Sequence, residues 1–265
     1  MSAPAFALEL LGWKRSPRED GKAKNKAGWE WVPNCADVDS KESITLAAGM
    51  LTNLGSADPN YAQTSAVLPP RNPGTGLEHR VREWLETELP ALGGDRQWQV
   101  LRGALITRYA QYRHLTGLDD LIEQYPNLRV TVGKDYLIKP DVTVGLLGTP
   151  TRDGFPFLHA AVSCKWTIRS DRVQNIRHEF NQMVRHRRGR QPHLVTVTAE
   201  PLPSRLAAIA RGTGEVDATY HIAFNELGKA VAESRNEPQR NAWSEVVGQG
   251  RLMDYNLLAA SLVAW

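Results

Sequence analysis

The fold of this chain is decided by three consecutive stretches: FLHAAVSCKW (157–166), DRVQNIRHEFNQMVRHRR (171–188) and HLVTVTAE (193–200). The first and third have the length and the β-branched, apolar character of buried strands. The middle stretch places five apolar side chains on one face of a helix, namely Val173, Ile176, Phe180, Met183 and Val184. A strand, a helix and a second strand in this order predict an α/β core.

The flanking sequence extends this core in both directions. Further short β-rich runs are expected to complete a central sheet: LRVTV (128–132), DVTVGLL (141–147) and YHIAF (220–224). The first half of the chain shows helical periodicity instead, over residues 43–54, 77–89, 99–115 and 118–125. Because we find no internal repeat and no low-complexity linker, we expect residues 1–265 to form a single α/β domain.

Composition excludes several classes of protein. The chain has 265 residues, of which 42% are apolar and 23% are charged, so it is neither an intrinsically disordered protein nor a disulfide scaffold. The longest apolar stretch, Leu257–Trp265, is shorter than the ~18 residues that a membrane span needs. The N-terminus does not resemble a secretory signal, so we expect a cytoplasmic protein with reduced cysteines at Cys35 and Cys164.

Positive charge is concentrated in one segment. Residues 165–190 contain eight Lys and Arg residues against two acidic ones, a net charge of +6, whereas the whole chain carries only +3. A site for a polyanion is one interpretation. The alternative is a solvated basic helix end at RHRRGR (185–190), which many proteins without a nucleic-acid partner also carry.

A carboxylate and a lysine are expected to meet on neighbouring strands. Asp141 opens one predicted strand, and the next ends at Ser163-Cys164-Lys165. Hydrolysis of a phosphodiester needs a divalent metal, and Mg²⁺ prefers oxygen ligands such as Asp141. This is the arrangement of the PD-(D/E)xK nucleases, except that Ser163 stands where an acid is expected. Glu179, on the following helix, is the best candidate for the missing acid; its alternative role is to pair with Arg172 or His186.

The start of the same helix carries residue types that recognise G·C pairs. Arg169, Asp171 and Arg172 lie close together in RSDR. Guanine offers two acceptors to arginine in the major groove, and cytosine offers an amino donor to aspartate. Alternatively, Ser170 simply caps the helix, and its charged neighbours form ion pairs.

Longer blocks carry a closer resemblance. They are SCKWTIRSDRVQNIRHE (163–179), RGRQPHLVTVTAEPLPSR (188–205), IKPDV (138–142), ITRYAQYRHLTGL (106–118) and GTGEVDATYHIAF (212–224). In these blocks the chain resembles the NgoMIV family of type II restriction endonucleases, which recognise sites built around CCGG. The resemblance covers most of the chain after residue 30. It implies a restriction-endonuclease-like core with a central mixed sheet flanked by helices.

The resemblance also implies roles for residues of the catalytic site. The family takes its second acid from the helix after the lysine in a K-x13-E pattern, and Lys165 and Glu179 have that spacing. A glutamate on an N-terminal helix matches Glu78 in GTGLE (74–78). That residue has a competing structural interpretation, because Thr75 to Glu78 has the spacing of a helix capping box.

Recognition residues follow from the same resemblance. Family members read CCGG with the residues that match Arg169, Asp171 and Arg172. For the outer base pairs the matches are Asp37 in VPNCAD (32–37) and Arg205 in PLPSR (201–205), which together imply the site GCCGGC. The chain departs from the family in two places: Arg71 and Asn72 replace an expected glutamine, and the connection from Asp141 to Ser163 is short.

We therefore expect Mg²⁺-dependent, sequence-specific cleavage of double-stranded DNA, with one or two Mg²⁺ ions in each active site. The expected metal ligands are Asp141, Cys164 and Glu179; Lys165 orients the water, and Glu78 and Ser163 complete the catalytic set. A palindromic site implies a homodimer, and the resemblance extends this to a homotetramer. The alternatives are a less specific PD-(D/E)xK nuclease and a non-catalytic DNA-binding protein.

Overall fold

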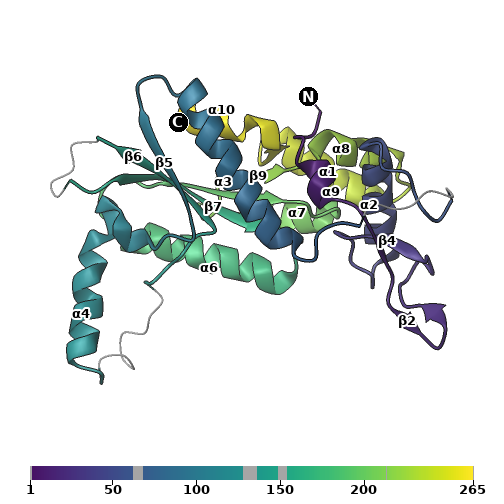
Figure 1. Cartoon of the computed structure of the whole chain (residues 1–265), viewed down its shortest axis with the longest axis horizontal. Helices are drawn as coiled ribbons and strands as arrows, with labels where there is room; N and C mark the ends of the chain where they lie inside the picture. The colour runs from purple at the N-terminus through teal and green to yellow at the C-terminus, as the bar shows by residue number, and fades with distance from the viewer. Residues whose placement is uncertain (1, 62–67, 128–135, 149–153, 213, 265) are drawn as a thin grey trace.

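The computed structural model of the chain describes residues 2–61, 68–127, 136–148, 154–212 and 214–264. Its centre is a six-stranded mixed sheet in the order β10-β9-β8-β7-β6-β5 (Figure 1). Strands β7, β8, β9 and β10 are parallel to one another, whereas β5 and β6 add two antiparallel strands at one edge. The strands are β5 (Gln97–Arg102), β6 (Val142–Leu147), β7 (Phe157–Lys165), β8 (His193–Thr198), β9 (Ala218–His221) and β10 (Leu252–Asp254).

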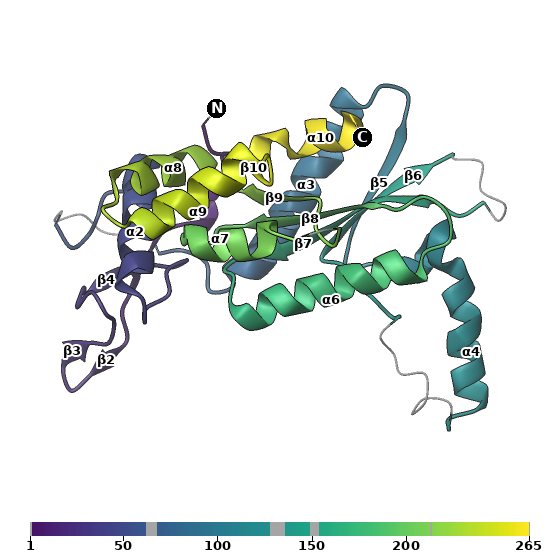
Figure 2. The same cartoon turned by 180° about the vertical axis from the view of Figure 1, so that it is seen from behind.

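The strand–helix–strand core is confirmed. Every residue of β7 from Leu158 to Cys164 is buried, as expected of a central strand with both faces covered. Helix α6 (Ser170–His186) follows β7 and buries Ile176, Phe180 and Met183. It runs below the strands in Figures 1 and 2, and the chain then returns through β8, parallel to β7. The α/β fold with helices around a mixed central sheet is therefore the observed one.

Helices from the first half of the chain cover other parts of the sheet. Helix α3 (Pro73–Leu92) buries a leucine or valine every fourth residue, at Leu77, Val81, Leu85 and Leu89, and packs against β5, β6 and β7. Helix α2 (Lys41–Asn53) packs against α8 (Phe224–Glu233). The packing of α3 against β7 brings the N-terminal end of α3 near the carboxyl end of β7, where the predicted catalytic residues lie.

The remaining elements are short. The N-terminal region contains α1 (Ala7–Leu10) and two small antiparallel sheets of two strands, β1 (Trp13–Arg15) with β4 (Trp31–Pro33) and β2 (Arg18–Glu19) with β3 (Lys22–Ala23). Helix α4 (Thr116–Gln124) projects from the body at the end opposite these small sheets (Figure 1). The others are α7 (Pro203–Ala210), α9 (Glu237–Gly248), α10 (Leu258–Ala264), and the 3₁₀ turns η1 (Ile106–Arg108), η2 (Ala110–Leu115) and η3 (Tyr255–Leu257).

The predicted helix over residues 99–115 is wrong. Residues 97–102 form the edge strand β5, which pairs with β6 through Val100 and Val144, and Gly103 follows with a positive φ of 58°. Beyond it, the buried residues Ile106, Tyr109, Tyr112 and Leu115 recur every third position. A spacing of three is that of a 3₁₀ helix, and the chain forms two such turns here.

The other predicted strands have different outcomes. The stretch LRVTV begins at Leu128, and residues 128–135 lie outside the described residues. The strand predicted over residues 220–224 ends at His221, because Phe224 already begins α8.

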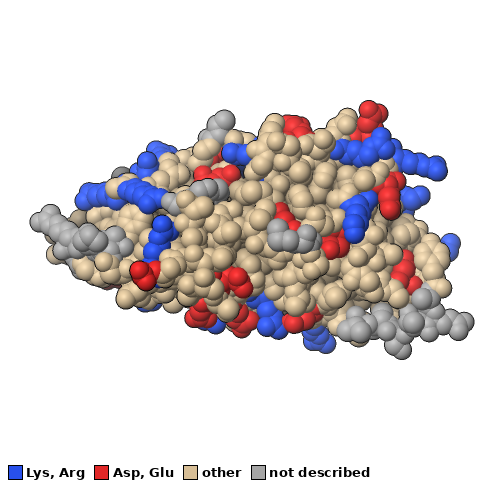
Figure 3. All heavy atoms as spheres, turned by 90° about the horizontal axis from the view of Figure 1, so that it is seen from above, with Lys and Arg blue, Asp and Glu red and all other residues tan. Residues whose placement is uncertain are grey.

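Among the described helices, none is both long enough and apolar enough to cross a membrane. Seen from above, basic and acidic side chains are interspersed around a mostly uncharged middle (Figure 3).

Candidate active site

Asp141 and Lys165 are in direct contact. Strand β6 begins at Val142, which pairs with Val162 of the antiparallel strand β7, so Asp141 lies beside the end of β7. The Asp141 Oδ2 atom accepts hydrogen bonds from the Lys165 Nζ and from the Cys164 backbone N–H, each over 2.7 Å. Ser163 Oγ lies 3.5 Å from the same oxygen. The sheet thus brings together the carboxylate and the lysine, as their positions on neighbouring strands predicted.

Glu179 faces this pair from helix α6. Burial is the main cause that raises the pKa of Glu179; the negative charge of Asp141 raises it further, and Lys165 opposes both. Glu179 therefore lies within electrostatic reach of both groups. Within the described part of the chain it has neither a hydrogen bond nor an ion pair, so the alternative partners Arg172 and His186 are not found.

Glu78 lies inside helix α3. The helix begins at Pro73 after Asn72, so Thr75 is a helical residue and the capping-box interpretation is wrong. The Glu78 carboxylate instead accepts a hydrogen bond from Arg102 of β5 over 3.0 Å. Arg102 was not expected beside Glu78, because the predicted helix over residues 99–115 lies where the chain forms β5.

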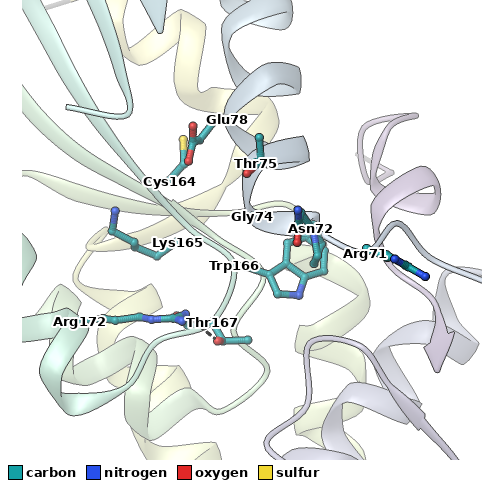
Figure 4. A pocket seen from close by; sticks show the side chains of 11 residues that line it. Arg71, Asn72, Gly74, Thr75, Glu78, Cys164, Lys165, Trp166, Thr167 and Arg172 are labelled. Carbon is teal, nitrogen blue, oxygen red and sulfur yellow. Dashed lines mark hydrogen bonds between the residues drawn. The ribbon is translucent and has the colours of Figure 1, made fainter. Parts of the chain in front are cut away.

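A cavity opens in front of these residues. It has a volume of about 540 Å³ and is lined by the N-terminal end of α3 and the end of β7 (Figure 4). Glu78 and Cys164 lie next to each other on its wall, and Lys165 and Arg172 line it as well. Glu78 also lines a second cavity of about 260 Å³ with Asp141 and Arg102. Glu78, Asp141 and Lys165 are therefore accessible to a substrate from the surface, whereas Glu179 lines neither of these two cavities and Ser163 is buried.

The predicted reading residues lie at the start of α6. Arg169 and Asp171 are exposed. Arg172 donates hydrogen bonds from its Nη1 to the carbonyl oxygen and the hydroxyl of Thr167, over 2.8 and 3.0 Å (Figure 4). Ser170 is the first residue of the helix and makes no capping hydrogen bond, so the interpretation of Ser170 as a helix cap is wrong.

Asp37 and Arg205 form an ion pair with each other. Asp37 precedes α2, whereas Arg205 lies in α7, so the fold joins positions 168 residues apart. Burial alone would raise the pKa of Asp37, but hydrogen bonds from Arg205 and from the Asp39 N–H outweigh it, and the pKa is lowered. The positive charge of Arg169 also lowers the pKa of Asp37. Asp37 and Arg205, the candidates for reading the outer base pairs, therefore lie near the RSDR segment.

The carboxylate oxygens of this site are the type of ligand that a hard divalent cation prefers. Asp141 and Glu179 offer carboxylate oxygens, and Mg²⁺ typically uses one or two carboxylates and fills its other positions with water and substrate phosphate. Among the described residues, no cluster of three or more His, Cys, Asp or Glu side chains is arranged to hold a metal. Burial, followed by the charge of Asp141, raises the pKa of the Cys164 thiol, so its sulfur remains protonated and is a poor metal ligand.

A mixed sheet with Asp141 before one strand and Lys165 at the end of the next defines the class: a restriction-endonuclease-like nuclease core of the PD-(D/E)xK type. Comparison with known proteins agrees. The family model described as NgoMIV restriction enzyme matches residues 18–153 and 147–263. The type II restriction enzyme NgoMIV of Neisseria gonorrhoeae is 37% identical over 262 residues, which cover 87% of this chain and 90% of that enzyme.

The chain therefore belongs to the NgoMIV restriction enzyme family, whose members are type II restriction endonucleases, that is, site-specific deoxyribonucleases. A crystal structure of the pre-specific restriction endonuclease BsaWI in complex with DNA also matches. It has 13% sequence identity and a TM-score of 0.35, over 84% of this chain and 71% of that one.

Proposed function

We propose that the enzyme is a Mg²⁺-dependent restriction endonuclease that cuts both strands of DNA at a palindrome with a CCGG core, GCCGGC. The observation that supports this best is the 2.7 Å contact between Asp141 and Lys165 beside an open cavity. A single domain, residues 1–265, would carry both the recognition of the sequence and the cleavage. Its place of action would be the cytoplasm.

Each residue of the proposed catalytic set has a distinct role. Asp141 and Glu179 would hold the metal, and Cys164 would contribute through its main-chain carbonyl oxygen, since its thiol is protonated. When bound, Mg²⁺ supplies neutralisation of phosphate charge and activation of water. Lys165 donates a hydrogen bond that orients the attacking water, and Ser163 supports the carboxylate of Asp141.

Glu78 completes the proposed acidic set from helix α3, beside Cys164 on the cavity wall. Its hydrogen bond from Arg102 holds the carboxylate at the cavity wall. That contact links β5 to α3, the two elements that carry Arg102 and Glu78. Glu78 would then act close to the metal together with Asp141.

Recognition is proposed to use two groups of side chains. Arg169, Asp171 and Arg172 would read the CCGG core in the major groove, and their exposure at the start of α6 suits the first two for this role. Arg172 would exchange its contacts with Thr167 for a guanine. The four arginines within residues 185–190 would contact phosphates and supply salt-dependent affinity.

The palindrome implies a homodimer in which each subunit cuts one strand, and two such dimers would assemble into a homotetramer. Two other functions predict different results. A non-catalytic binding protein would bind DNA without cutting it, and a less specific nuclease would cut without regard to CCGG. The contact between Asp141 and Lys165 favours the nuclease over the binding protein, because binding alone does not require it.

The test of the proposed function is cleavage of two plasmids, one with GCCGGC and one without it. We expect discrete fragments that map to the hexamer in the presence of Mg²⁺, and no cleavage with EDTA. A smear from both plasmids would identify a less specific nuclease. Binding without cleavage would identify the non-catalytic alternative.

Cleavage should weaken in mild acid because of Glu179. A metal ligand must be ionised, and the raised pKa of Glu179 means that it takes up a proton at a higher pH than an ordinary glutamate. At limiting Mg²⁺ the cleavage rate should therefore fall as pH decreases through this pKa, by about tenfold per pH unit below it. Rates measured across the acidic range at two Mg²⁺ concentrations check this. The fall should move to lower pH at the higher concentration; a profile independent of Mg²⁺ would contradict the assignment.

Replacement of Asp37 should alter preference for the outer base pairs only. In Asp37→Asn we expect the ratio of cleavage at GCCGGC to cleavage at other CCGG hexamers to fall by about 5- to 150-fold, the value of one good base contact. Cleavage at CCGG itself should persist. The control is Asp39→Asn, which changes an exposed neighbour. An unchanged ratio would remove Asp37 from the recognition set.

A further inference from the structure

Glu200 is a buried charged residue to which the proposed mechanism assigns no role. It lies in the short connection between β8, which ends at Thr198, and α7, which begins at Pro203. Its side chain has no exposed surface. Burial of a carboxylate is unfavourable unless hydrogen bonds or opposite charges compensate, so the partners of Glu200 show what its presence achieves.

Both carboxylate oxygens of Glu200 hold backbone groups. Oε2 accepts a hydrogen bond from the Ile168 N–H over 2.8 Å, and Oε1 accepts one from the Leu202 N–H over 3.1 Å. Ile168 belongs to the connection between β7 and α6, whereas Leu202 belongs to the one between β8 and α7. The Glu200 side chain therefore hydrogen-bonds to both loops that follow the adjacent parallel strands β7 and β8.

The backbone of Glu200 is itself held in place. The imidazole Nδ1 of His221 accepts the Ala223 N–H over 3.1 Å, so the neutral ring carries its proton on Nε2 and donates it to the Glu200 carbonyl oxygen over 3.1 Å. Burial lowers the pKa of His221 to about 4, against smaller opposing effects of these two hydrogen bonds, so the ring is neutral at physiological pH. The hydrogen bond from His221 thus connects the backbone of Glu200 to β9.

The two loops that Glu200 joins carry recognition candidates. Arg169 directly follows Ile168. Arg205 lies in the first turn of α7, with its Nη1 3.8 Å from Glu200 Oε2, while its Nη2 bonds to Asp37. Among the described residues, Glu200 is the side chain that contacts both loops and Arg205 at once.

We propose that Glu200 is a positioning residue for sequence recognition: it sets the placement of the Arg169 loop relative to Arg205 and so determines discrimination of the outer base pairs. This inference rests on the proposed function of the same surface. The hydrogen bonds and ion pair of the Glu200 side chain involve Ile168, Leu202 and Arg205 and no proposed metal ligand. Substitution of Glu200 would therefore change which sequences are cut and leave the cleavage step itself unchanged.

The unfavourable free energy of burying the Glu200 carboxylate supports a functional role for this residue. Burial is the main cause that raises its pKa to about 7; the two backbone hydrogen bonds and Arg205 oppose this, and Asp37 adds to it. Because the pKa is raised in the folded state, the folded protein binds more protons than the unfolded one between the ordinary value of 4.5 and about 7. Stability therefore decreases as pH rises through that window. Ionisable groups whose pKa is strongly perturbed by burial are frequent at functional sites.

The test compares Glu200→Gln with a matched control. Glutamine preserves size but removes one acceptor oxygen, so one of the two loops loses its anchor. The control is Asp217→Asn, which alters a partly buried carboxylate that also accepts a backbone N–H, that of Leu194 over 2.7 Å, at the opposite end of β8. For each variant, kcat and KM are measured on GCCGGC and on CCGG hexamers with changed outer base pairs, together with Tm.

We expect Glu200→Gln to reduce the ratio of kcat/KM values between the two substrates by about tenfold, through KM, while kcat at GCCGGC stays within about twofold of the wild type. Asp217→Asn should leave the ratio unchanged. A ratio that is unchanged in Glu200→Gln overturns the inference, because general destabilisation lowers activity on all substrates equally.

Two further outcomes are distinguishable. If Glu200→Gln does not fold, Glu200→Asp serves instead: it keeps the charge but is too short to reach both loops, and it should show the same loss of discrimination. If the wild type cuts CCGG sites without preference for the outer pairs, the proposed site GCCGGC is wrong, and the inference falls with it. If the wild type prefers other outer pairs, the ratio is taken for those pairs and the same criterion applies.

Discussion

The Asp141→Asn variant should cleave DNA at least about 10³-fold more slowly than the wild type, because a metal that stabilises the transition state contributes several kcal/mol. The substitution preserves the shape of the side chain, but it removes the charge that pairs with Lys165 and would hold Mg²⁺. Binding to a GCCGGC duplex should persist, since the proposed role of Asp141 is to hold the metal at the phosphate and not to contact the bases. Cleavage rates at saturating enzyme, with a mobility-shift measurement of binding, check both expectations.

Asp120→Asn is the control for this prediction, because it removes an exposed carboxylate on α4. It should cleave like the wild type. Substantial cleavage by Asp141→Asn would mean that Asp141 is a structural partner of Lys165, and the metal site would have to be sought elsewhere. Loss of binding together with cleavage would instead indicate that the substitution disturbs the fold.

Lys165→Met should lower kcat by about 10²- to 10⁴-fold, the usual contribution of a group that assists proton transfer to or from the attacking water. Methionine retains most of the apolar stem but removes the ammonium group, whose Nζ lies 2.7 Å from Asp141. The loss should appear in kcat with little change in KM, because the lysine acts on the cleavage step. Single-turnover kinetics at saturating Mg²⁺ separate the two constants.

Two comparison variants distinguish catalysis from simple loss of charge. Lys41→Met removes an exposed ammonium at the start of α2 and should leave kcat unchanged. Lys165→Arg keeps the charge but changes the geometry of the donor, and it should remain strongly impaired. Equal activity of Lys165→Arg and the wild type would show that only the charge matters and would remove the role in orienting water.

Sequence patterns were sufficient where neighbouring strands determine the geometry. Asp141 and Lys165 were expected to meet because each lies at the end of a strand, and the pairing of Val142 with Val162 achieves this. The strand β5 was missed because apolar residues at a spacing of three beyond it resembled helical periodicity. Arg102, which is part of β5, was therefore not expected beside Glu78.

Contacts between distant segments could not be predicted. The pairing of Asp37 with Arg205 joins positions 168 residues apart and depends on how α7 packs after β8. Nothing in the local sequence indicates that Glu200 is buried, since its neighbours are those of an ordinary strand end. Such long-range contacts are consequences of the assembled fold and not of local propensity.

The short connection from Lys165 to Arg172 has a consequence for engineering. Because the lysine and the proposed core-reading side chains are separated by a few residues of one loop and one helical turn, the proposed core recognition could not be exchanged as a module separate from the lysine. A redesign that exchanges this segment to obtain a new core specificity would also displace the lysine. Asp37 and Arg205 lie on separate segments, so directed evolution toward new flanking preferences should begin there.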